Sequence, residues 1–352
     1  MWDDLERLEK IDRSKMWKLL FDFPLQCQQA IRLADTLPLS PQTPGKFKKT
    51  VVCGLGGSAI GGDILKTLLF QELKIPILIN RNYGLPRLVD EESLVFIVSY
   101  SGNTEEALSA YEEGKKRRSF LISICSGGKL KDLSKQDEVP CLIVPSGMPP
   151  RTTIGYLSIP MLKVLERLKW IEPQNYDELL QVLHDVRKRC HPKVPLSKNS
   201  AKSLAQELIG RIPLVYGVEG NTDVVAHRLK TQFNENSKIL AFWDVFPELN
   251  HNEIVGWGGE GRTDLTRFYP IFIRDHREEE RIKKRIEVTQ SIIKKRKVKW
   301  AEIWTEGKDK LTRVLSAIYM GDWVSFYLAI AEEVDPTPVK MIDFLKKELS
   351  KI

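Results

Sequence analysis

Short apolar segments alternate with segments of helical spacing along most of the chain, and this alternation limits the fold more than any other feature. The apolar segments form two series: 51–53, 75–79, 94–98, 120–124 and 141–144, then 213–218, 239–243, 269–273 and 298–303. Strands separated by helices are typical of βαβ units, in which the strands run parallel and helices cover both faces of the sheet. We therefore predict an α/β protein with two doubly wound parallel sheets.

The length of 352 residues is enough for two domains, each with its own apolar core. A polar stretch of Pro, Ser and Thr at 38–44 is typical of a linker, and the spacing of apolar residues before it predicts one or two helices. The predicted boundaries are an N-terminal helical segment over 1–45, a first sheet domain over 46–170, a helical connector over 171–198, a second sheet domain over 199–335 and a C-terminal helix over 336–352.

The C-terminal helix has an apolar stripe. Val339, Ile342, Leu345 and Leu349 recur at helical spacing. This pattern predicts that the helix packs against one of the domains.

Two turns rich in glycine and hydroxyl side chains follow the first and third strands of the first predicted sheet. They are Gly-Leu-Gly-Gly-Ser-Ala-Ile-Gly-Gly-Asp at 54–63 and Ser-Tyr-Ser-Gly-Asn-Thr-Glu-Glu at 99–106. Hydroxyls and backbone N–H groups at a helix N-terminus favour an anion, because the helix dipole and the unpaired N–H groups both attract negative charge. A single serine there is usually an N-cap, but several hydroxyls from two strand ends indicate a phosphate site. The predicted phosphate-binding residues are Gly57, Ser58, Ser99, Ser101 and Thr104.

A dinucleotide site is the alternative for the first turn, since Gly54-x-Gly56-x-x-Ala59 fits the dinucleotide fingerprint. That fingerprint expects an acidic residue about 20 positions later to hold a ribose, whereas the chain has Asn80-Arg81-Asn82 there. Arg81 could accept the extra phosphate of NADP. An NADP-dependent oxidoreductase therefore stays open as the less favoured alternative.

The second series of strands contains a divergent copy of the first turn. The segment 214–221 aligns without gaps on 51–58, but Asn221 stands where the first copy has Ser58. Nothing like the segment 99–104 recurs. We expect only the first copy to bind phosphate.

Composition favours a soluble protein that acts on small molecules. The net charge of +7 comes largely from the stretch 277–299, whose spacing predicts a solvated amphipathic helix, and no nucleic-acid-binding motif is readable. We expect no membrane span, because no apolar stretch approaches 18 uncharged residues, and the acidic N-terminus is unlike a signal peptide, which favours a cytoplasmic protein. The cysteines, Cys27, Cys53, Cys125, Cys141 and Cys190, are expected to be buried free thiols. The scattered histidines offer no metal cluster.

Four further segments sharpen the interpretation. They are Gln-Phe-Asn-Glu-Asn at 232–236, Glu-Leu-Asn-His-Asn-Glu at 248–253, Pro150-Arg151 and Ile-Asp-Phe-Leu-Lys at 342–346. Together with the two turns they resemble the bifunctional phosphoglucose/phosphomannose isomerase family, across nearly the whole chain. The resemblance implies two sugar isomerase (SIS) domains, and interconversion of glucose 6-phosphate or mannose 6-phosphate with fructose 6-phosphate through an enediol. It also implies no metal or organic cofactor, and a homodimer with a shared active site at the junction of the two domains.

The resemblance assigns roles to four residues. Glu235 matches the catalytic base, and His251 matches a ring-opening histidine supplied by the partner subunit. Arg151 matches a cation that stabilises the enediolate, and Lys346 matches a C-terminal lysine near the sugar hydroxyls, with adjacent Lys347 as the alternative. Without the resemblance, the glutamate, the histidine and the lysines would be interpreted as solvated surface residues. The alternative for the arginine is a structural salt bridge. A non-catalytic phosphosugar sensor would use the same turns without a base and remains the main alternative.

Overall fold

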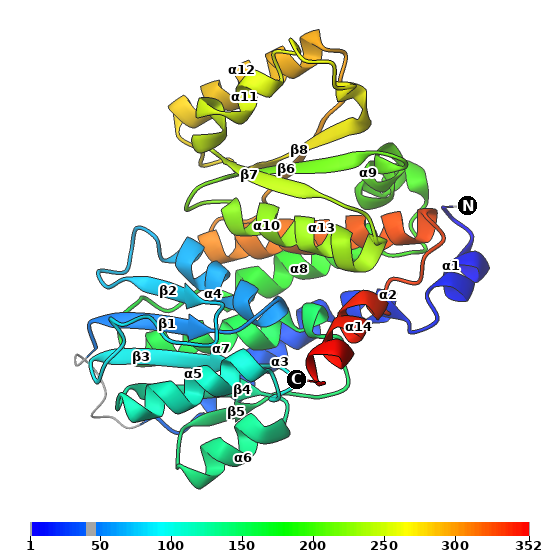
Figure 1. Cartoon of the computed structure of the whole chain (residues 1–352). Helices are drawn as coiled ribbons and strands as arrows, with labels where there is room; N and C mark the ends of the chain where they lie inside the picture. Colours follow the sequence, from blue (N-terminus) through cyan, green and yellow to red (C-terminus); the bar gives the residue numbers. More distant parts are fainter. Residues whose placement is uncertain (1, 40–46, 352) are drawn as a thin grey trace. The chain divides into compact units, whose positions relative to one another are not determined.

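The computed structural model describes residues 2–39 and 47–351, and the chain forms two compact units (Figure 1). The five-stranded unit comprises Asp22–Gln181 and Gly307–Val314. The four-stranded unit comprises Met1–Phe21, Val182–Glu306 and Leu315–Ile352. The division passes through two helices, α8 (Tyr176–Cys190) and α13 (Lys310–Ala331), so each contributes residues to both units.

The five-stranded unit contains one parallel sheet in the order β2-β1-β3-β4-β5. Its strands are β1 (Lys49–Cys53), β2 (Ile77–Asn80), β3 (Ser93–Val98), β4 (Phe120–Cys125) and β5 (Cys141–Ile143). Its remaining helices are α3 (Phe23–Asp35), α4 (Gly57–Leu68), α5 (Glu105–Lys116), α6 (Gly128–Gln136), the 3-10 turn η1 (Pro150–Thr152) and α7 (Ile154–Arg167).

Burial explains why this sheet is parallel and covered by helices. Every residue of β3 is buried, and the central β1 is buried from Thr50 onward. Strands that are apolar on both faces must be covered on both sides, which βαβ crossovers achieve. The carboxyl ends of β1 and β3 are neighbours, because Cys53 is in register with Ile97. The turns that follow the two strands therefore begin side by side.

The four-stranded unit contains a second parallel sheet in the order β7-β6-β8-β9. Its strands are β6 (Ile212–Val218), β7 (Phe242–Phe246), β8 (Phe268–Arg274) and β9 (Ala301–Trp304). Its remaining helices are α1 (Leu5–Ile11), α2 (Met16–Phe21), α9 (Ser200–Leu208), α10 (Asp223–Gln232), α11 (Glu253–Gly256), α12 (Glu280–Lys295) and α14 (Lys340–Leu349). Short turns are η2 (Leu196–Lys198), the π-helical η3 (Phe233–Ser237), η4 (Glu248–His251) and η5 (Leu265–Arg267).

The predicted fold class is confirmed, since both sheets are parallel and alternate with helices. One strand was misplaced: the apolar segment 239–243 predicted it three residues too early, and the strand is β7. The N-terminal region holds three helices rather than one or two. Most of the predicted linker at 38–44 lies outside the described residues.

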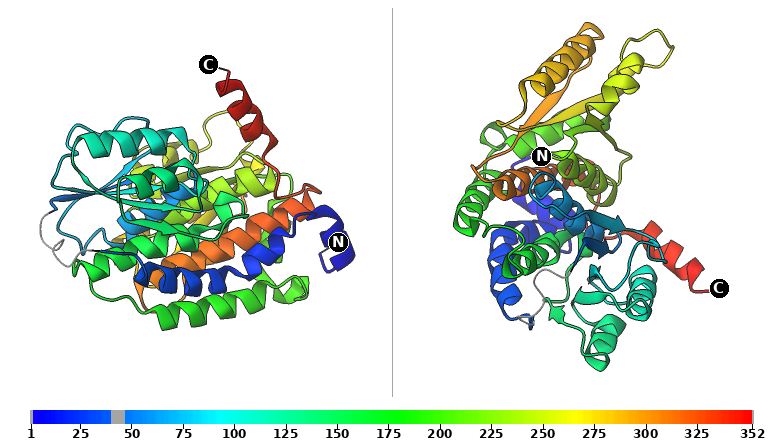
Figure 2. Two further views of the ribbon diagram at one scale, coloured as in Figure 1. Left: turned by 90° about the horizontal axis from the view of Figure 1, so that it is seen from below. Right: turned by 90° about the vertical axis from the view of Figure 1, so that its left-hand side faces the viewer.

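The prediction that the C-terminal helix packs against a domain is wrong for the single chain. None of the residues of α14, all of them described, is buried, and Phe344 and Leu345 are 61% and 57% exposed. In both views of Figure 2 this red helix projects away from the other elements of its unit. The apolar stripe is present as predicted, but no part of the four-stranded unit covers it.

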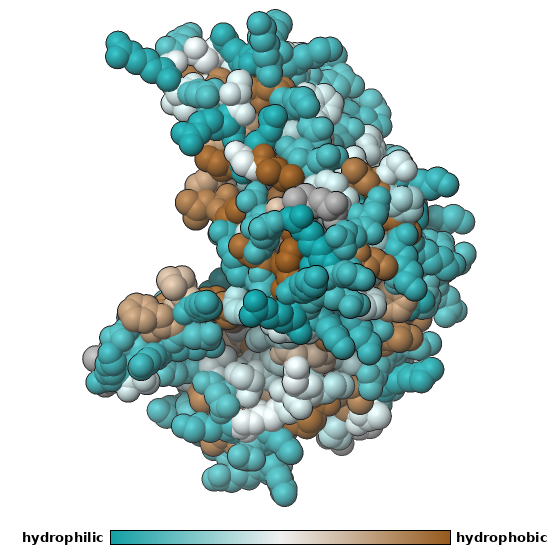
Figure 3. Space-filling view, turned by 90° about the vertical axis from the view of Figure 1, so that its right-hand side faces the viewer, coloured by the Kyte–Doolittle hydropathy of each residue, from teal (hydrophilic) through white to brown (hydrophobic). Residues whose placement is uncertain are grey.

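Helix α13 is strongly apolar. Among the described residues it is the one helix long and apolar enough to cross a membrane by length and composition. It contains Arg313 and Asp322, so the sequence observation that no apolar stretch approaches 18 uncharged residues still holds. In the structure 94% of its apolar window is buried, as in the core helix of a globular protein. The face of the molecule drawn in Figure 3 is mostly hydrophilic, with apolar side chains in small separate groups.

Candidate functional site

The two hydroxyl-rich turns of the five-stranded unit are in contact. Ser58 lies in the first turn of α4, is 6% exposed, and its Oγ accepts a hydrogen bond from the backbone N–H of Tyr100 at 3.4 Å. In the second turn the Oγ of Ser99 lies 2.8 Å from the Oγ1 of Thr104. The predicted phosphate residues therefore form one cluster at the carboxyl ends of β1 and β3.

Ser101 completes this cluster on its exposed side. Its Oγ accepts a hydrogen bond from the backbone N–H of Asn103 at 3.2 Å, within the same turn. The turn begins in direct continuation of β3, so its backbone is set by the strand. Buried Ser58 and Ser99 and exposed Ser101 thus span the cluster from the interior to the surface.

A glycine fixes the shape of the second turn. Gly102 has a φ of +70°, and a Cβ atom added there would lie 1.8 Å from the carbonyl oxygen of Gly127. The backbone N–H of Leu130, in α6, donates to the carbonyl of Gly102 at 2.9 Å. The Ser126 N–H and hydroxyl both bind the carbonyl of Tyr100. The turn is therefore held in place by hydrogen bonds from the loop after β4 and from the start of α6.

The N-termini of α4 and α5 meet the requirements of an anion site. Their N-cap residues are Gly56 and Thr104, both in the described part of the chain. Gly56 has no side chain to cap α4, and the side chain of Thr104 forms no capping hydrogen bond. An uncapped helix start offers N–H groups and the positive end of the dipole to an anion. Hydroxyl hydrogen bonds to a charged acceptor contribute roughly 1.5–3 kcal/mol each.

Arg151 lies beside the first turn. A Cβ atom added to Gly57 would lie 2.9 Å from the carbonyl oxygen of Pro150 and 3.2 Å from the Cα of Arg151, so the backbones of η1 and α4 touch. Arg151 is 4% exposed. The loop before it is tied to the second turn, because the Tyr100 hydroxyl donates to the carbonyl of Pro145 and accepts from the N–H of Met148, both at 3.0 Å. The structure thus brings Arg151 and the phosphate residues together.

Glu235 lies in a π-helical turn at the end of α10. The α-helix α10 ends at Gln232, and η3 continues it as a wider π-helical turn. Such π segments often occur at functional sites. The turn is held by α13: the Asn236 amide donates to the Oγ of Ser325 at 3.0 Å, and the Ser237 hydroxyl donates to the Ser325 carbonyl at 2.7 Å.

A buried ion pair extends this support one turn back along α10. Arg228 binds Asp322 through two nitrogens, at 3.1 and 2.7 Å, and the Gln232 amide donates to the same carboxylate at 3.0 Å. Burial raises the pKa of Asp322, and the charge of Arg228 opposes that shift. Removing one member of such a pair would leave an uncompensated buried charge. The end of α10 is therefore firmly placed.

Glu235 lines a pocket of about 810 Å³ within the four-stranded unit. The other lining residues come from α1, η3, the start of α14 and the residues next to these elements. They include the cations Lys10, Arg13, Lys238 and Lys340 and the acidic residues Glu333 and Asp335. With Glu235, the lining therefore has three acidic and four cationic side chains. The described residues that line this pocket include neither His251 nor Lys346.

His251 and Lys346 are both exposed. His251 is the last residue of η4, and Lys346 and Lys347 lie in the uncovered helix α14. The single chain therefore does not bring these two predicted residues to Glu235.

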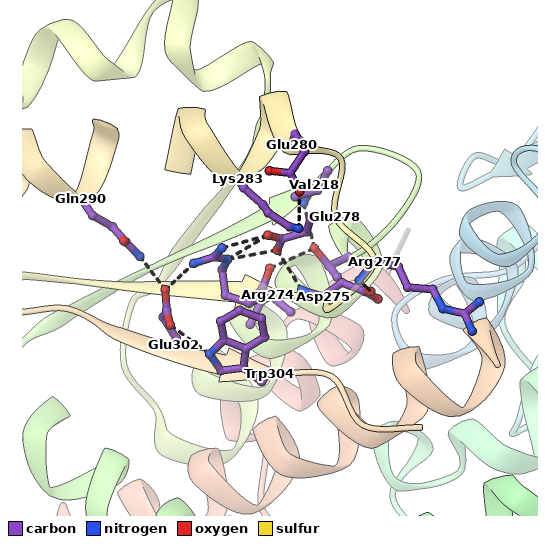
Figure 4. A network of polar contacts seen from close by, with 12 residues as sticks. Val218, Arg274, Asp275, Arg277, Glu278, Glu280, Lys283, Gln290, Glu302 and Trp304 are labelled. Carbon is purple, nitrogen blue, oxygen red and sulfur yellow. Dashed lines mark hydrogen bonds and ion pairs between the residues drawn. The ribbon is translucent and has the colours of Figure 1, made fainter. Parts of the chain in front are cut away.

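The counterpart of the phosphate turn in the second sheet is filled by an ion-pair network. β8 lies beside β6 as β3 lies beside β1. Figure 4 shows the end of β8, where Arg274 binds the carboxylates of Glu278 and Glu302, and the N–H of Asp275 donates to Glu278. These ion-paired side chains stand where the first sheet has its hydroxyl-rich turn. That only the first copy binds phosphate stays a prediction.

The structure also shows the surroundings of Arg81, the cysteines and the possible metal ligands. Arg81, which the NADP alternative requires, forms an ion pair with Asp63. The thiols are free, with Cys141 partly rather than fully buried, and burial raises the pKa values of Cys53 and Cys190 to about 12. Within residues 2–39 and 47–351 no group of three His, Cys, Asp or Glu side chains could hold a metal ion.

Sequence reasoning missed several residues around Glu235. The cations of α1 and Lys340 lie far from it in sequence, and no motif marks them. Asp322 could have been noticed, because it is an acidic residue in the middle of an otherwise apolar helical segment.

The chain is similar to several known proteins. The bacterial phospho-glucose isomerase C-terminal SIS domain matches residues 197–349. A protein of Caldicellulosiruptor bescii named bifunctional phosphoglucose/phosphomannose isomerase is 41% identical over 339 residues, which cover 96% of this chain and 99% of that protein. One of the same name from Aquifex aeolicus is 35% identical, covering 87% of this chain and 91% of its own.

A solved structure shows the same fold. A hypothetical protein of Thermus thermophilus superposes with a TM-score of 0.75 at 15% identity, covering 98% of this chain and 94% of that one. The identity to the named relatives extends over nearly the full length, and the resemblance inferred from the sequence is confirmed. The chain therefore belongs to the family of bifunctional phosphoglucose/phosphomannose isomerases.

Proposed function

We propose that this enzyme interconverts glucose 6-phosphate, mannose 6-phosphate and fructose 6-phosphate through a cis-enediol. The observation that carries the proposal is the contact between the two hydroxyl-rich turns, where Ser58 meets the turn of Ser99 and Thr104. In a member of this isomerase family, such a cluster is suited to anchor the phosphate of a sugar phosphate.

The proposed roles follow from the chemistry of each side chain. Ser58, Ser99, Ser101 and Thr104, with the backbone at Gly57, hold the phosphate. The carboxylate of Glu235 takes the proton from C2 and returns it to C1, and the permanent charge of Arg151 stabilises the oxygen that becomes negative. His251 and Lys346 assist the opening of the pyranose ring. No step needs a metal or an organic cofactor.

Activity on two aldose epimers has a simple explanation. Glucose and mannose 6-phosphates differ only at C2, so loss of the C2 proton gives both the same enediol. A site that lets the base reach either face of C2 would serve both substrates. The names of the relatives, which combine the two activities, support this extension.

Assembly as a homodimer is part of the proposal. His251 is exposed and does not line the Glu235 pocket in the single chain. A histidine donated by a second copy would complete the site without movement of η4.

The test is a direct assay with the purified protein in EDTA, without nucleotide. We expect fructose 6-phosphate to form from both aldose phosphates and, in D2O, to carry deuterium at C1, because the shuttled proton exchanges with solvent. Glu235→Gln should lower turnover by several orders of magnitude and leave sugar-phosphate affinity nearly unchanged. A variant that kept more than about a tenth of the activity would remove Glu235 from the role.

The same assay separates the alternatives. A phosphosugar sensor would bind fructose 6-phosphate without turnover. An oxidoreductase would need NADP, and its Arg81 would have to leave Asp63.

A further inference from the structure

His251 is the exposed last residue of η4, directly before α11, and the segment around it is anchored on both sides. On the N-terminal side, Leu249 is fully buried in the core cluster beside the sheet. The amide of the next residue, Asn250, donates to Thr289 at 3.0 Å and accepts from Arg285 at 3.3 Å. This anchor ties the loop to α12.

The second anchor is Glu253, two residues after the histidine. Its carboxylate accepts a hydrogen bond from the hydroxyl of Tyr216, which is 1% exposed on β6. The same hydroxyl accepts a hydrogen bond from the indole N–H of Trp257 at 3.0 Å. The backbone N–H of Glu253 donates to the side-chain oxygen of Asn252, which caps α11. Glu253 thus joins the first turn of α11 to the middle of the sheet.

The surroundings of this carboxylate disfavour its negative charge. It therefore depends on the hydrogen bonds that it accepts. Burial raises the pKa of Glu253, and Asp244 on β7 raises it further, whereas the hydrogen bonds from Tyr216 and Trp257 lower it. A buried carboxyl group is tolerated only where donors meet it. Glu253 in turn holds this segment in place through its hydrogen bond with Tyr216.

We propose that Glu253 is a positioning residue for His251: by holding the first turn of α11 to Tyr216, it sets the place from which the imidazole acts. The inference rests on the ring-opening role given to His251 in the proposed function. Glu253 itself touches no substrate in this proposal.

The test is a double-mutant cycle on the full-length enzyme. Glu253→Ala removes the anchor, whereas Glu253→Gln keeps an oxygen that can accept from Tyr216. We expect Glu253→Ala to lower kcat about tenfold or more with little change in KM, and Glu253→Gln to recover most of it. In the His251→Ala background the same Glu253→Ala change should have no further effect. Glu260→Ala, an exposed glutamate seven residues later, is the matched control.

Two outcomes would overturn the proposal. One is an equal loss from Glu253→Ala with and without His251, which would indicate a general structural role. The other is an unchanged kcat in Glu253→Ala.

Imidazole NMR gives a readout that does not depend on turnover. The His251 signal is assigned by its disappearance in His251→Ala, among five histidines. In Glu253→Ala it should move to the shift of a mobile, solvated histidine while the other four stay in place, and an unmoved signal would contradict the proposal. If His251→Ala retained full activity, the ring-opening role would fail, whereas this NMR comparison would still decide whether Glu253 holds the imidazole.

Discussion

At the scale of single residues, the phosphate cluster depends on backbone shape as much as on hydroxyls. Gly102 combines a left-handed φ with a contact that leaves no room for a side chain, since an added Cβ would lie 1.8 Å from the Gly127 carbonyl. The turn is tied to the segment after β4, because Ser126 binds the carbonyl of Tyr100 and Leu130 binds the carbonyl of Gly102.

Gly102→Ala should therefore displace the phosphate turn. We expect KM for glucose 6-phosphate to rise about tenfold or more, equivalent to about 1.4 kcal/mol of lost binding. Gly210→Ala is the matched control, because Gly210 has the same φ of +70° but no atom within 4 Å of the added Cβ. It should cost about 1–2 kcal/mol of stability from the left-handed backbone alone and leave KM unchanged. Steady-state kinetics and thermal unfolding of both variants check this, and equal KM values would contradict it.

At the scale of elements, the π-helical turn η3 places Glu235 through its contacts with α13. The Ser325 hydroxyl accepts from Asn236, which is fully buried, and donates to the carbonyl of Asp322 at 2.8 Å. The single side chain of Ser325 therefore connects η3 to α13.

Ser325→Ala should loosen η3. Loss of the hydrogen bond to a buried amide costs about 1–3 kcal/mol of stability, and a displaced Glu235 should lower kcat about tenfold or more with KM little changed. Ser158→Ala is the control, because that buried hydroxyl in α7 donates only to the carbonyl of Ile154, one turn earlier in the helix. Stability and kcat are measured together. A loss of stability with unchanged kcat would show that η3 does not position the base.

The elements also show how far sequence reasoning reaches. The strands of the first sheet were predictable because each is a short apolar run between turn signals, and the Ser and Gly turns lie at their ends, as expected from local chemistry. β7 was misplaced because the apolar run begins three residues before the strand, at Ile239. The π turn at Glu235 could not be predicted, since it depends on contacts with α13, almost 90 residues away. The uncovered face of α14 could not be foreseen either, because an apolar stripe does not name its partner.

At the scale of the whole molecule, proton binding links stability to pH through histidines that are kept neutral. His191 packs edge-on against the rings of Trp17 and Phe21, at 6.0 and 5.3 Å. Its Nδ1 accepts a hydrogen bond from the N–H of Lys193 at 3.0 Å, which only the neutral imidazole can do. Burial lowers the pKa of His191, and Lys193, Lys202 and Arg187 lower it further. Burial also lowers the pKa of His184.

These shifts predict that stability falls as the solution is acidified below about pH 6.5, the ordinary pKa of histidine. Between the ordinary pKa and the lowered pKa of the folded state, the unfolded chain binds protons that the folded chain does not bind. The free energy of unfolding therefore decreases as the pH falls through this range. His191→Gln cannot titrate. It should be less stable than the wild type at pH 7.5, because the ring contacts are lost, yet lose less of its melting temperature between pH 7.5 and 5.5. His184 remains in both proteins, so the slope should shrink rather than vanish. Parallel slopes in the two proteins would show that His191 takes up its proton equally in the folded and unfolded states.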